Sequence, residues 1–266
     1  MSDITLPKIG FGTWENTAPS QCAASVSEAI HCGYRFIDTA QIYRNEHYVG
    51  KGIAQSGIPR EELIVATKIW NANLSHEKVL KSTDESLKKL GLKSIDILYV
   101  HWPAGAYHAE NTLSAFSELV DKGKVAHIAV SNFTIELLEE ALYICEKPIV
   151  ANQVEMHPLL KQKEMVEFLQ NHNMYLVAYS PLARGYVFKT PELTEIAQKH
   201  SVTEAQVSLA WLMSHQNVIP IPKATSTEHI EDNFSALQLT LDQEDREKIE
   251  TITTEKRMVN TRFAPW

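Results

Sequence analysis

The chain has 266 residues, a formal charge of −8 at neutral pH and a hydrophobic content of 44%. This length fits one large domain, and α/β barrels commonly need about 250 residues. The acidic balance argues against nucleic acid as the main partner, because phosphate backbones are bound by clustered lysine and arginine.

Short apolar, β-branched runs recur along the chain, and each is followed by a longer helical pattern. The eight runs span 9–13, 35–40, 63–68, 95–101, 127–132, 149–155, 174–180 and 217–223. Amphipathic helical patterns lie between them, with two before the last run (191–200 and 203–215) and one after it (242–252). This alternation predicts parallel strands joined by helical crossovers. We therefore expect one (β/α)₈ TIM barrel over residues 1–266, with extra helices before the last strand and at the C-terminus.

An open, doubly wound α/β sheet is the competing fold. That fold usually carries a G-x-G-x-x-G turn after its first strand, and the chain has no such turn. No Pro/Gly/Ser-rich linker divides the sequence into two parts. A single barrel is therefore the simpler interpretation.

The three cysteines, Cys22, Cys32 and Cys145, form no C-x-x-C pair and leave one thiol over. Such usage favours a reducing compartment over a disulfide framework. We see no signal peptide at the N-terminus and no apolar stretch long enough for a bilayer. A cytoplasmic protein with no membrane partner is expected.

Polar residues stand at or near the C-terminal ends of the predicted strands. They are Asp38, Lys68, His101, Asn132, Gln153, Tyr179, Ser180 and Lys223. One such residue is usually a helix cap or a turn former, but barrel enzymes draw their catalytic groups from several strand ends on this face. The set predicts an active site there.

Several ordered segments carry a family resemblance. They are GYRFIDTAQIYRNEHYVGKGI (33–53), VATKIWN (65–71), DILYVHWP (96–103), GKVAHIAVSNF (123–133), VANQVEMHP (150–158), VAYSPLARG (177–185) and VIPIPKATSTEHIEDNF (218–234). Together with the first run they resemble the aldo-keto reductase family from residue 9 to about residue 240. The chain length and the ending KRMVNTRFAPW resemble the compact bacterial members, of the 2,5-diketogluconate reductase B and methylglyoxal reductase type.

The resemblance implies a catalytic tetrad for carbonyl reduction. Tyr43 would donate the proton, but a free phenol has a pKa near 10, which is high for a proton donor at neutral pH. Lys68 is expected to lower that pKa, and Asp38 to pair with Lys68. His101 would give a second hydrogen bond to the substrate oxygen.

Each tetrad residue also has a purely structural interpretation. Asp38 could cap a nearby helix, and Tyr43 could be a partly buried aromatic. Lys68 could be a solvent-exposed residue just past its strand. His101 could be a loop residue whose hydrogen bonds are satisfied locally. Their occurrence together in the family's order favours the tetrad.

The resemblance also implies NADPH (NADP⁺) as the cofactor. It assigns Ser131, Asn132 and Gln153 to the nicotinamide amide, with Tyr179 stacked on the ring; Gln153 could instead be satisfied inside the barrel. Barrels often hold phosphate in the loops after strands seven and eight, where backbone N–H groups are free. The remaining predicted cofactor contacts are Thr13, Asp38, Ser180, Leu182, Gly185, Lys223, Thr225, His229 and Asn233.

Lys223 and His229 are predicted to bind the 2′-phosphate of NADPH, and Asn233 to contact the adenine. Many relatives have Lys-Ser and a downstream arginine where this chain has Lys223-Ala224 and His229. The change removes a hydroxyl and replaces a permanent charge with a group that titrates near pH 6.5.

Trp14, Trp70 and Trp102 stand where relatives line the substrate pocket, although indole is also a common core residue. The chain after His101 and the tail after residue 252 are short, which predicts an open site with short loops. Such a site favours small, activated carbonyls such as methylglyoxal, and keto-sugar acids, because little remote binding energy is available. We expect a monomer without a metal.

Two other classes of function remain open. Lys68 could form a Schiff base, as in a barrel aldolase, although such an enzyme has no need of the SPLARG and PKATS segments. The chain could also bind a cofactor for regulation, but no segment resembles an interaction tail.

Overall fold

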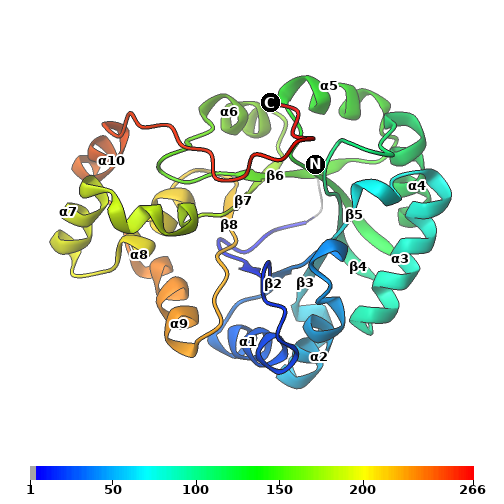
Figure 1. Ribbon diagram of the computed structural model, residues 1–266, viewed down its shortest axis with the longest axis horizontal. Helices are drawn as coiled ribbons and strands as arrows, with labels where there is room; N and C mark the ends of the chain where they lie inside the picture. The colour runs from blue at the N-terminus through cyan, green and yellow to red at the C-terminus, as the bar shows by residue number, and fades with distance from the viewer. Residues whose placement is uncertain (1–3) are drawn as a thin grey trace.

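Eight parallel strands form in the order of the predicted runs (Figure 1). The structure is a computed structural model, and it describes residues 4–266. The strands are β1 (Phe11–Gly12), β2 (Phe36–Asp38), β3 (Ile64–Ile69), β4 (Ile95–Val100), β5 (Val125–Ser131), β6 (Ile149–Glu155), β7 (Tyr175–Tyr179) and β8 (Val218–Pro220). Each strand pairs in parallel with the next one in the chain. The predicted (β/α)₈ fold is confirmed.

Backbone hydrogen bonds between the first and last strands close the sheet. The N–H of Gly10 donates to the carbonyl of Pro220 at 2.9 Å, and the N–H of Gly12 to that of Pro222 at 3.0 Å. Pro220 and Pro222 have no backbone N–H to donate to the neighbouring strand, so fewer ladder hydrogen bonds form. This explains why β1 and β8 are shorter than predicted. A Cβ on Gly12 would lie 2.6 Å from the carbonyl oxygen of Ile221, so glycine permits this close approach.

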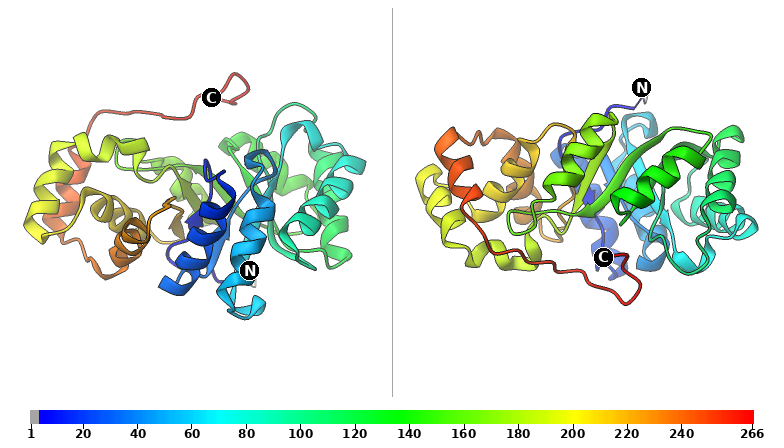
Figure 2. Two further views of the ribbon diagram at one scale, coloured as in Figure 1. Left: turned by 60° about the horizontal axis from the view of Figure 1, so that its bottom comes forward. Right: turned by 90° about the horizontal axis from the view of Figure 1, so that it is seen from above.

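Helices surround the barrel and include the predicted extra ones (Figure 2). They are α1 (Pro19–Cys32), α2 (Glu46–Ser56), α3 (His76–Leu90), α4 (Ala109–Asp121), α5 (Ile135–Ile144), α6 (Lys163–Asn171), α7 (Pro191–His200), α8 (Glu204–Met213), α9 (Thr227–Ser235) and α10 (Gln243–Glu250). Local signals set their ends: α8 begins at a capping box of Thr203 and Gln206, and α3 stops at Gly91, whose φ is 68°. Between residues 4 and 266 no helix is long and apolar enough to cross a membrane.

Alternate residues of each strand fill the inside of the barrel. The interior cluster includes Phe36, Ala66, Tyr99, Ala129, Ala151, Val177 and Ile219. The neighbours of these residues, such as Leu98 and Val100, belong to the larger core between strands and helices. Because side chains on a strand alternate between its faces, the residue two positions after each interior residue also faces inward, one layer nearer the C-terminal ends.

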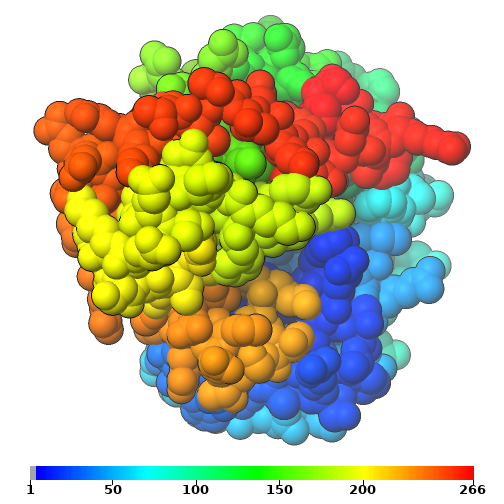
Figure 3. All heavy atoms as spheres, turned by 60° about the vertical axis from the view of Figure 1, so that its left-hand side comes forward, coloured from blue at the N-terminus to red at the C-terminus, as the bar shows by residue number. Residues whose placement is uncertain are grey.

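The C-terminal tail, residues 251–266, follows α10 and crosses one end of the barrel (Figures 1 and 2). In the space-filling view it forms a band beside the segment between β7 and α7 (Figure 3). The tail therefore runs over one end of the barrel.

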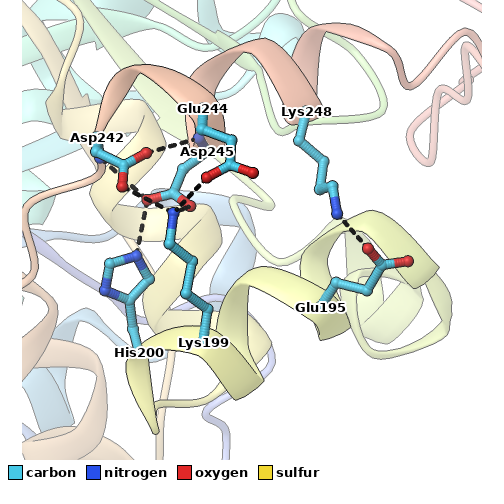
Figure 4. A network of polar contacts seen from close by, with 7 residues as sticks. All are labelled: Glu195, Lys199, His200, Asp242, Glu244, Asp245 and Lys248. Carbon is cyan, nitrogen blue, oxygen red and sulfur yellow. Dashed lines mark hydrogen bonds and ion pairs between the residues drawn. The ribbon is translucent and has the colours of Figure 1, made fainter.

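An ion-pair network fixes the base of the tail by joining α10 to α7 (Figure 4). Lys199 Nζ lies 2.7 Å from Asp242, 3.2 Å from Glu244 and 2.9 Å from Asp245, and His200 also contacts Asp245 at 2.7 Å. These contacts raise the pKa of Lys199 and lower that of Asp242 to about 2. The lysine ammonium supplies the positive charge between the carboxylates, so this cluster is structural.

Candidate active site

A polar layer follows the apolar interior at the C-terminal end of the barrel. Its members, each two positions after an interior residue of its strand, are Asp38, Lys68, His101, Ser131, Gln153 and Tyr179. Five of them belong to the strand-end set predicted from the sequence, and Ser131 was predicted as a cofactor contact. The fold therefore brings six predicted side chains from six strands into one layer, on the face where barrel enzymes place their chemistry.

Lys68 and Asp38 form a buried ion pair at the centre of this layer. Their side chains are 0% and 2% exposed, and the Lys68 ammonium donates to Asp38 Oδ1 and, at 2.9 Å, to the carbonyl of Thr39. Gln153 Nε2 donates to the other carboxylate oxygen at 2.9 Å. Burial raises the pKa of Asp38 and lowers that of Lys68, and each charge opposes the effect on the other. Each residue therefore stabilises its partner's charge.

Tyr43 ends a short 3₁₀ turn, Gln41–Tyr43, that follows β2. Its ring centroid lies 5.2 Å from Lys68 Nζ, and its ring meets that of His101 edge-on at 5.8 Å. Burial, followed by the negative charge of Asp38, raises the pKa of Tyr43 well above 10. This direction is opposite to the lowering expected from Lys68, because burial and the charge of Asp38 both raise the pKa of the phenol. The phenol is thus held protonated at neutral pH.

His101 follows β4 and is 7% exposed. Burial, followed by the charge of Lys68, lowers its pKa well below 6.5, so the imidazole is neutral at neutral pH. Its ring lies between those of Tyr43 and Trp70, the latter at 5.3 Å. Nδ1 has no hydrogen-bond partner among residues 4–266. A neutral imidazole can still donate one hydrogen bond to a ligand.

Amide and hydroxyl groups lie together beside the ion pair. Asn132, in the left-handed region with a φ of 63°, donates from Nδ2 to the carbonyl of His101 at 3.0 Å and to Ser131 Oγ at 3.1 Å. The Tyr179 hydroxyl donates to Asn132 Oδ1 at 2.8 Å, and Ser131 Oγ to the carbonyl of Gln153 at 2.8 Å. These contacts fix a cluster of donors and acceptors suited to an amide.

A cavity of about 620 Å³ opens above the polar layer. The predicted residues in its walls are Thr13, Trp14, Asp38, Tyr43, Trp70, His101, Trp102, Ser131, Asn132, Gln153, Tyr179, Ser180, Leu182, Gly185 and Lys223. Lys68 does not line it, because it is completely buried. Thr225, His229 and Asn233 also lie outside it, in the loop after β8 and on α9. His229 is exposed, whereas Asn233 is buried.

Several wall residues were missed by the sequence prediction. They include Ile42, Arg184, Phe188, Val259, Thr261 and Phe263. Arg184, in the segment after β7, stacks over Trp14 with its guanidinium 4.7 Å from the ring centroid. The positive charge of Arg184 in the SPLARG segment was visible in the sequence, but its reach across the barrel to Trp14 was not.

The C-terminal tail adds a wall that the prediction of an open, short-looped site did not include. Phe263 packs edge-on against Trp70 at 5.8 Å and against Trp102 at 5.2 Å, so the tail forms part of the wall. The prediction considered how short the tail is and not where it runs. An extended chain covers about 3.3 Å per residue, enough for this tail to cross the barrel. The signal that was overlooked is the pair of aromatic residues, Phe263 and Trp266, at the end of the chain.

This combination defines a class of protein: an α/β-barrel enzyme whose site presents a phenol, a neutral imidazole and a buried lysine–aspartate pair to a small molecule. Comparison with known proteins gives the family. The Aldo/keto reductase family profile matches residues 8–254. The 9,11-endoperoxide prostaglandin H2 reductase of Trypanosoma cruzi (strain CL Brener) is 39% identical over 260 residues, or 97% of this chain and 91% of the relative.

Methylglyoxal reductase DkgB of Salmonella typhi is also 39% identical, over 97% of both chains. A crystal structure of a putative 2,5-diketo-D-gluconic acid reductase B superimposes with a TM-score of 0.93 at 36% identity, covering 97% of this chain and 92% of that one. The chain therefore belongs to the aldo/keto reductase family. It is an oxidoreductase that acts on carbonyl groups, and the predicted resemblance is confirmed.

Proposed function

We propose that the chain reduces small, activated aldehydes and ketones to alcohols, with NADPH as the hydride donor and Tyr43 as the proton donor. The observation that carries this proposal is the convergence of Tyr43, His101 and the Lys68–Asp38 pair beneath a cavity with aromatic walls. Relatives named methylglyoxal reductase and glyoxal reductase support dicarbonyls as substrates. Keto-sugar acids are the second substrate class that we propose.

The proposed reaction adds a hydride to the carbonyl carbon and a proton to the carbonyl oxygen. When bound, the reduced nicotinamide supplies the hydride. Tyr43 transfers its hydroxyl proton to the oxygen, and the neutral His101 donates a hydrogen bond to the same atom as its negative charge develops. An alkoxide is a stronger base than a phenolate, so a phenol with a raised pKa still gives up its proton. Lys68 then stabilises the phenolate until the phenol regains a proton from water.

The residues beside the ion pair fit a nicotinamide. Ser131, Asn132 and Gln153 offer the donors and acceptors that a carboxamide needs, and the ring of Tyr179 offers a face for stacking. The segment after β7 adopts left-handed backbone at Ser180, with a φ of 49°, and at Gly185, with a φ of 88°. Such backbone can turn successive N–H groups toward a phosphate.

Preference for NADPH over NADH is assigned to the loop after β8 and the start of α9. Lys223 is exposed at the edge of the cavity, and His229 is exposed in the first turn of the helix. Both can reach solvent-facing phosphate oxygens, and a helix N-terminus favours an anion. In this arrangement Thr225 contacts the same phosphate and Asn233 the adenine.

We also propose that the enzyme works as a monomer in the cytoplasm. Cys22, Cys32 and Cys145 are free thiols, which suits a reducing compartment.

A steady-state assay tests this proposal. Methylglyoxal should be reduced with NADPH at a kcat/KM about tenfold or more above that with NADH, because a charge-assisted contact to the 2′-phosphate is present only for NADPH. Lys223→Ala should remove most of this difference and leave NADH-dependent turnover unchanged. A preference for bulky steroid ketones, or no cofactor consumption with any small carbonyl, would contradict the proposal.

A further inference from the structure

The last residue of β6, Glu155, holds the C-terminal tail. It lies two positions after Gln153 and faces the same end of the barrel. Its side chain is completely buried, and its carboxylate accepts hydrogen bonds from the backbone N–H of Met258 at 2.6 Å and of Val259 at 2.8 Å. The third contact is His157 Nε2, at 2.9 Å.

These hydrogen bonds are the polar contacts of the buried Glu155 carboxylate. In the part of the chain that the structure describes, neither a lysine nor an arginine forms an ion pair with Glu155. A carboxylate taken out of water is very unfavourable unless hydrogen-bond donors replace the lost solvent, and bonds to an ionised acceptor are strong. Two of the donors of Glu155 belong to the tail. The carboxylate therefore favours the docked tail over a detached one.

Other contacts along the tail are made by partly exposed side chains: Lys256 Nζ lies 3.4 Å from the ring centroid of Tyr186, and Met258 packs half-buried against the core. No residue from 253 to 266 is fully buried, although residues 256–259 are half-buried and Arg257 Nη1 and Thr261 Oγ1 are shielded from solvent. A second cavity of about 580 Å³ borders the tail and is lined in part by Thr253, Thr254, Glu255, Arg257 and Trp266. The nearest further backbone contact is the N–H of Lys256, which donates to the carbonyl of Leu159 at 2.8 Å. Apolar burial of this segment is thus partial, and the Glu155 carboxylate is its contact with a completely buried polar group.

The clamped stretch leads directly into the wall of the active-site cavity. Val259 is itself a wall residue, and Thr261 and Phe263 follow within four positions. Phe263 packs against Trp70 and Trp102. Moving the backbone at residues 258 and 259 would therefore move the aromatic side of the substrate cavity.

We propose that Glu155 is a positioning residue for substrate binding: its carboxylate clamps the tail, and the tail places Phe263 against Trp70 and Trp102. This inference rests on the proposed carbonyl reduction, because it assigns the clamped wall to the substrate. Glu155 itself does not line the cavity. It acts through the backbone of the tail.

Glu155→Gln tests the clamp with little change in volume. A carboxamide keeps one acceptor oxygen but turns an NH₂ group toward the second tail N–H, so one contact is lost. Hydrogen exchange followed by mass spectrometry should show faster exchange in peptides from residues 257–263 than in the parent. The KM for methylglyoxal should rise on the order of tenfold, with a smaller change in kcat and an unchanged Kd for NADPH.

A double-mutant cycle with Phe263→Ala tests whether Glu155 affects substrate binding through Phe263. If Glu155 acts through Phe263, Phe263→Ala should raise KM by itself, and Glu155→Gln should add little to it. The matched control is Glu85→Gln, because Glu85 is exposed on α3 and should leave both exchange and KM as in the parent.

The outcomes separate this inference from the proposed function. Unchanged exchange in Glu155→Gln would overturn the clamp, whether or not the chain reduces carbonyls. Faster exchange with an unchanged KM, or additive effects in the cycle, would overturn the positioning role and leave the proposed reaction standing. Should Glu155→Gln fail to fold, Met258→Pro removes one donor at a residue that does not line the cavity. The same rise in exchange and KM is expected, and parental values would overturn the proposal.

Discussion

Replacing Tyr43 by phenylalanine should lower kcat for carbonyl reduction by about 10²-fold or more, because the variant has no phenol to protonate the developing alkoxide. The ring contacts with Lys68 and His101 do not need the hydroxyl, so the site should keep its shape. The Kd for NADPH should stay close to that of the parent, since the phenol faces the substrate. Steady-state kinetics together with a cofactor titration would measure both quantities.

Tyr143→Phe is the matched control for this variant. Tyr143 is 92% exposed on α5, so the loss of its hydroxyl should leave kcat unchanged. If Tyr43→Phe keeps its rate within a few-fold of the parent, another group supplies the proton and the assignment of Tyr43 is wrong.

Asp38→Asn should cost both stability and activity. The carboxylate is the charged partner of Lys68, and both side chains are almost completely excluded from solvent. Removing one member of a buried ion pair leaves the other charge uncompensated, which typically costs about 3–5 kcal/mol. The free energy of unfolding from urea titrations should fall by that amount.

The loss of stability in Asp38→Asn should also depend on pH, and it should become smaller as the pH rises. Burial already lowers the pKa of Lys68, and without Asp38 nothing opposes that shift. A lysine whose folded pKa lies below its unfolded value of about 10.4 binds fewer protons in the folded state, so stability rises with pH between the two values. The variant should therefore recover stability relative to the parent as the pH is raised from 7 toward 10.

Asp121→Asn serves as the control for the buried pair. Asp121 pairs with Lys147 at the surface, where it is 61% exposed, and its replacement should change stability little. An equal loss in Asp121→Asn and Asp38→Asn, or a loss in Asp38→Asn that does not change with pH, would contradict the account of the Lys68–Asp38 pair.

Much of the barrel and its polar layer was predictable because both follow one periodicity. Apolar runs of strand length alternate with helical patterns. Within a strand, successive residues on the same face are two positions apart, so a residue two positions after an interior residue also faces inward. Asp38 follows Phe36, Lys68 follows Ala66 and Gln153 follows Ala151 in this way. Local sequence was therefore sufficient to gather these side chains at one end of the barrel.

Features that depend on long-range geometry were not predictable in the same way. The position of Phe263 beside Trp70 depends on the path of a tail without regular structure, which no periodicity encodes. The pKa of Tyr43 depends on burial and on the charge of Asp38, and the sequence shows only that Lys68 is available. The contacts of Glu155 with backbone groups of the tail leave no trace in residue identity, because any residue except proline provides an N–H.

Hydride transfer from NADPH to a carbonyl carbon is the reaction that we propose for this site. The most direct measurement uses NADPH with deuterium at both C4 positions of the nicotinamide, methylglyoxal in ordinary water, and mass spectrometry of the product. The expected product is an alcohol with one deuterium on the former carbonyl carbon, formed at a rate that Tyr43→Phe lowers about 10²-fold or more. A product without deuterium, or no reduction together with borohydride trapping of the substrate on Lys68, would contradict the proposal.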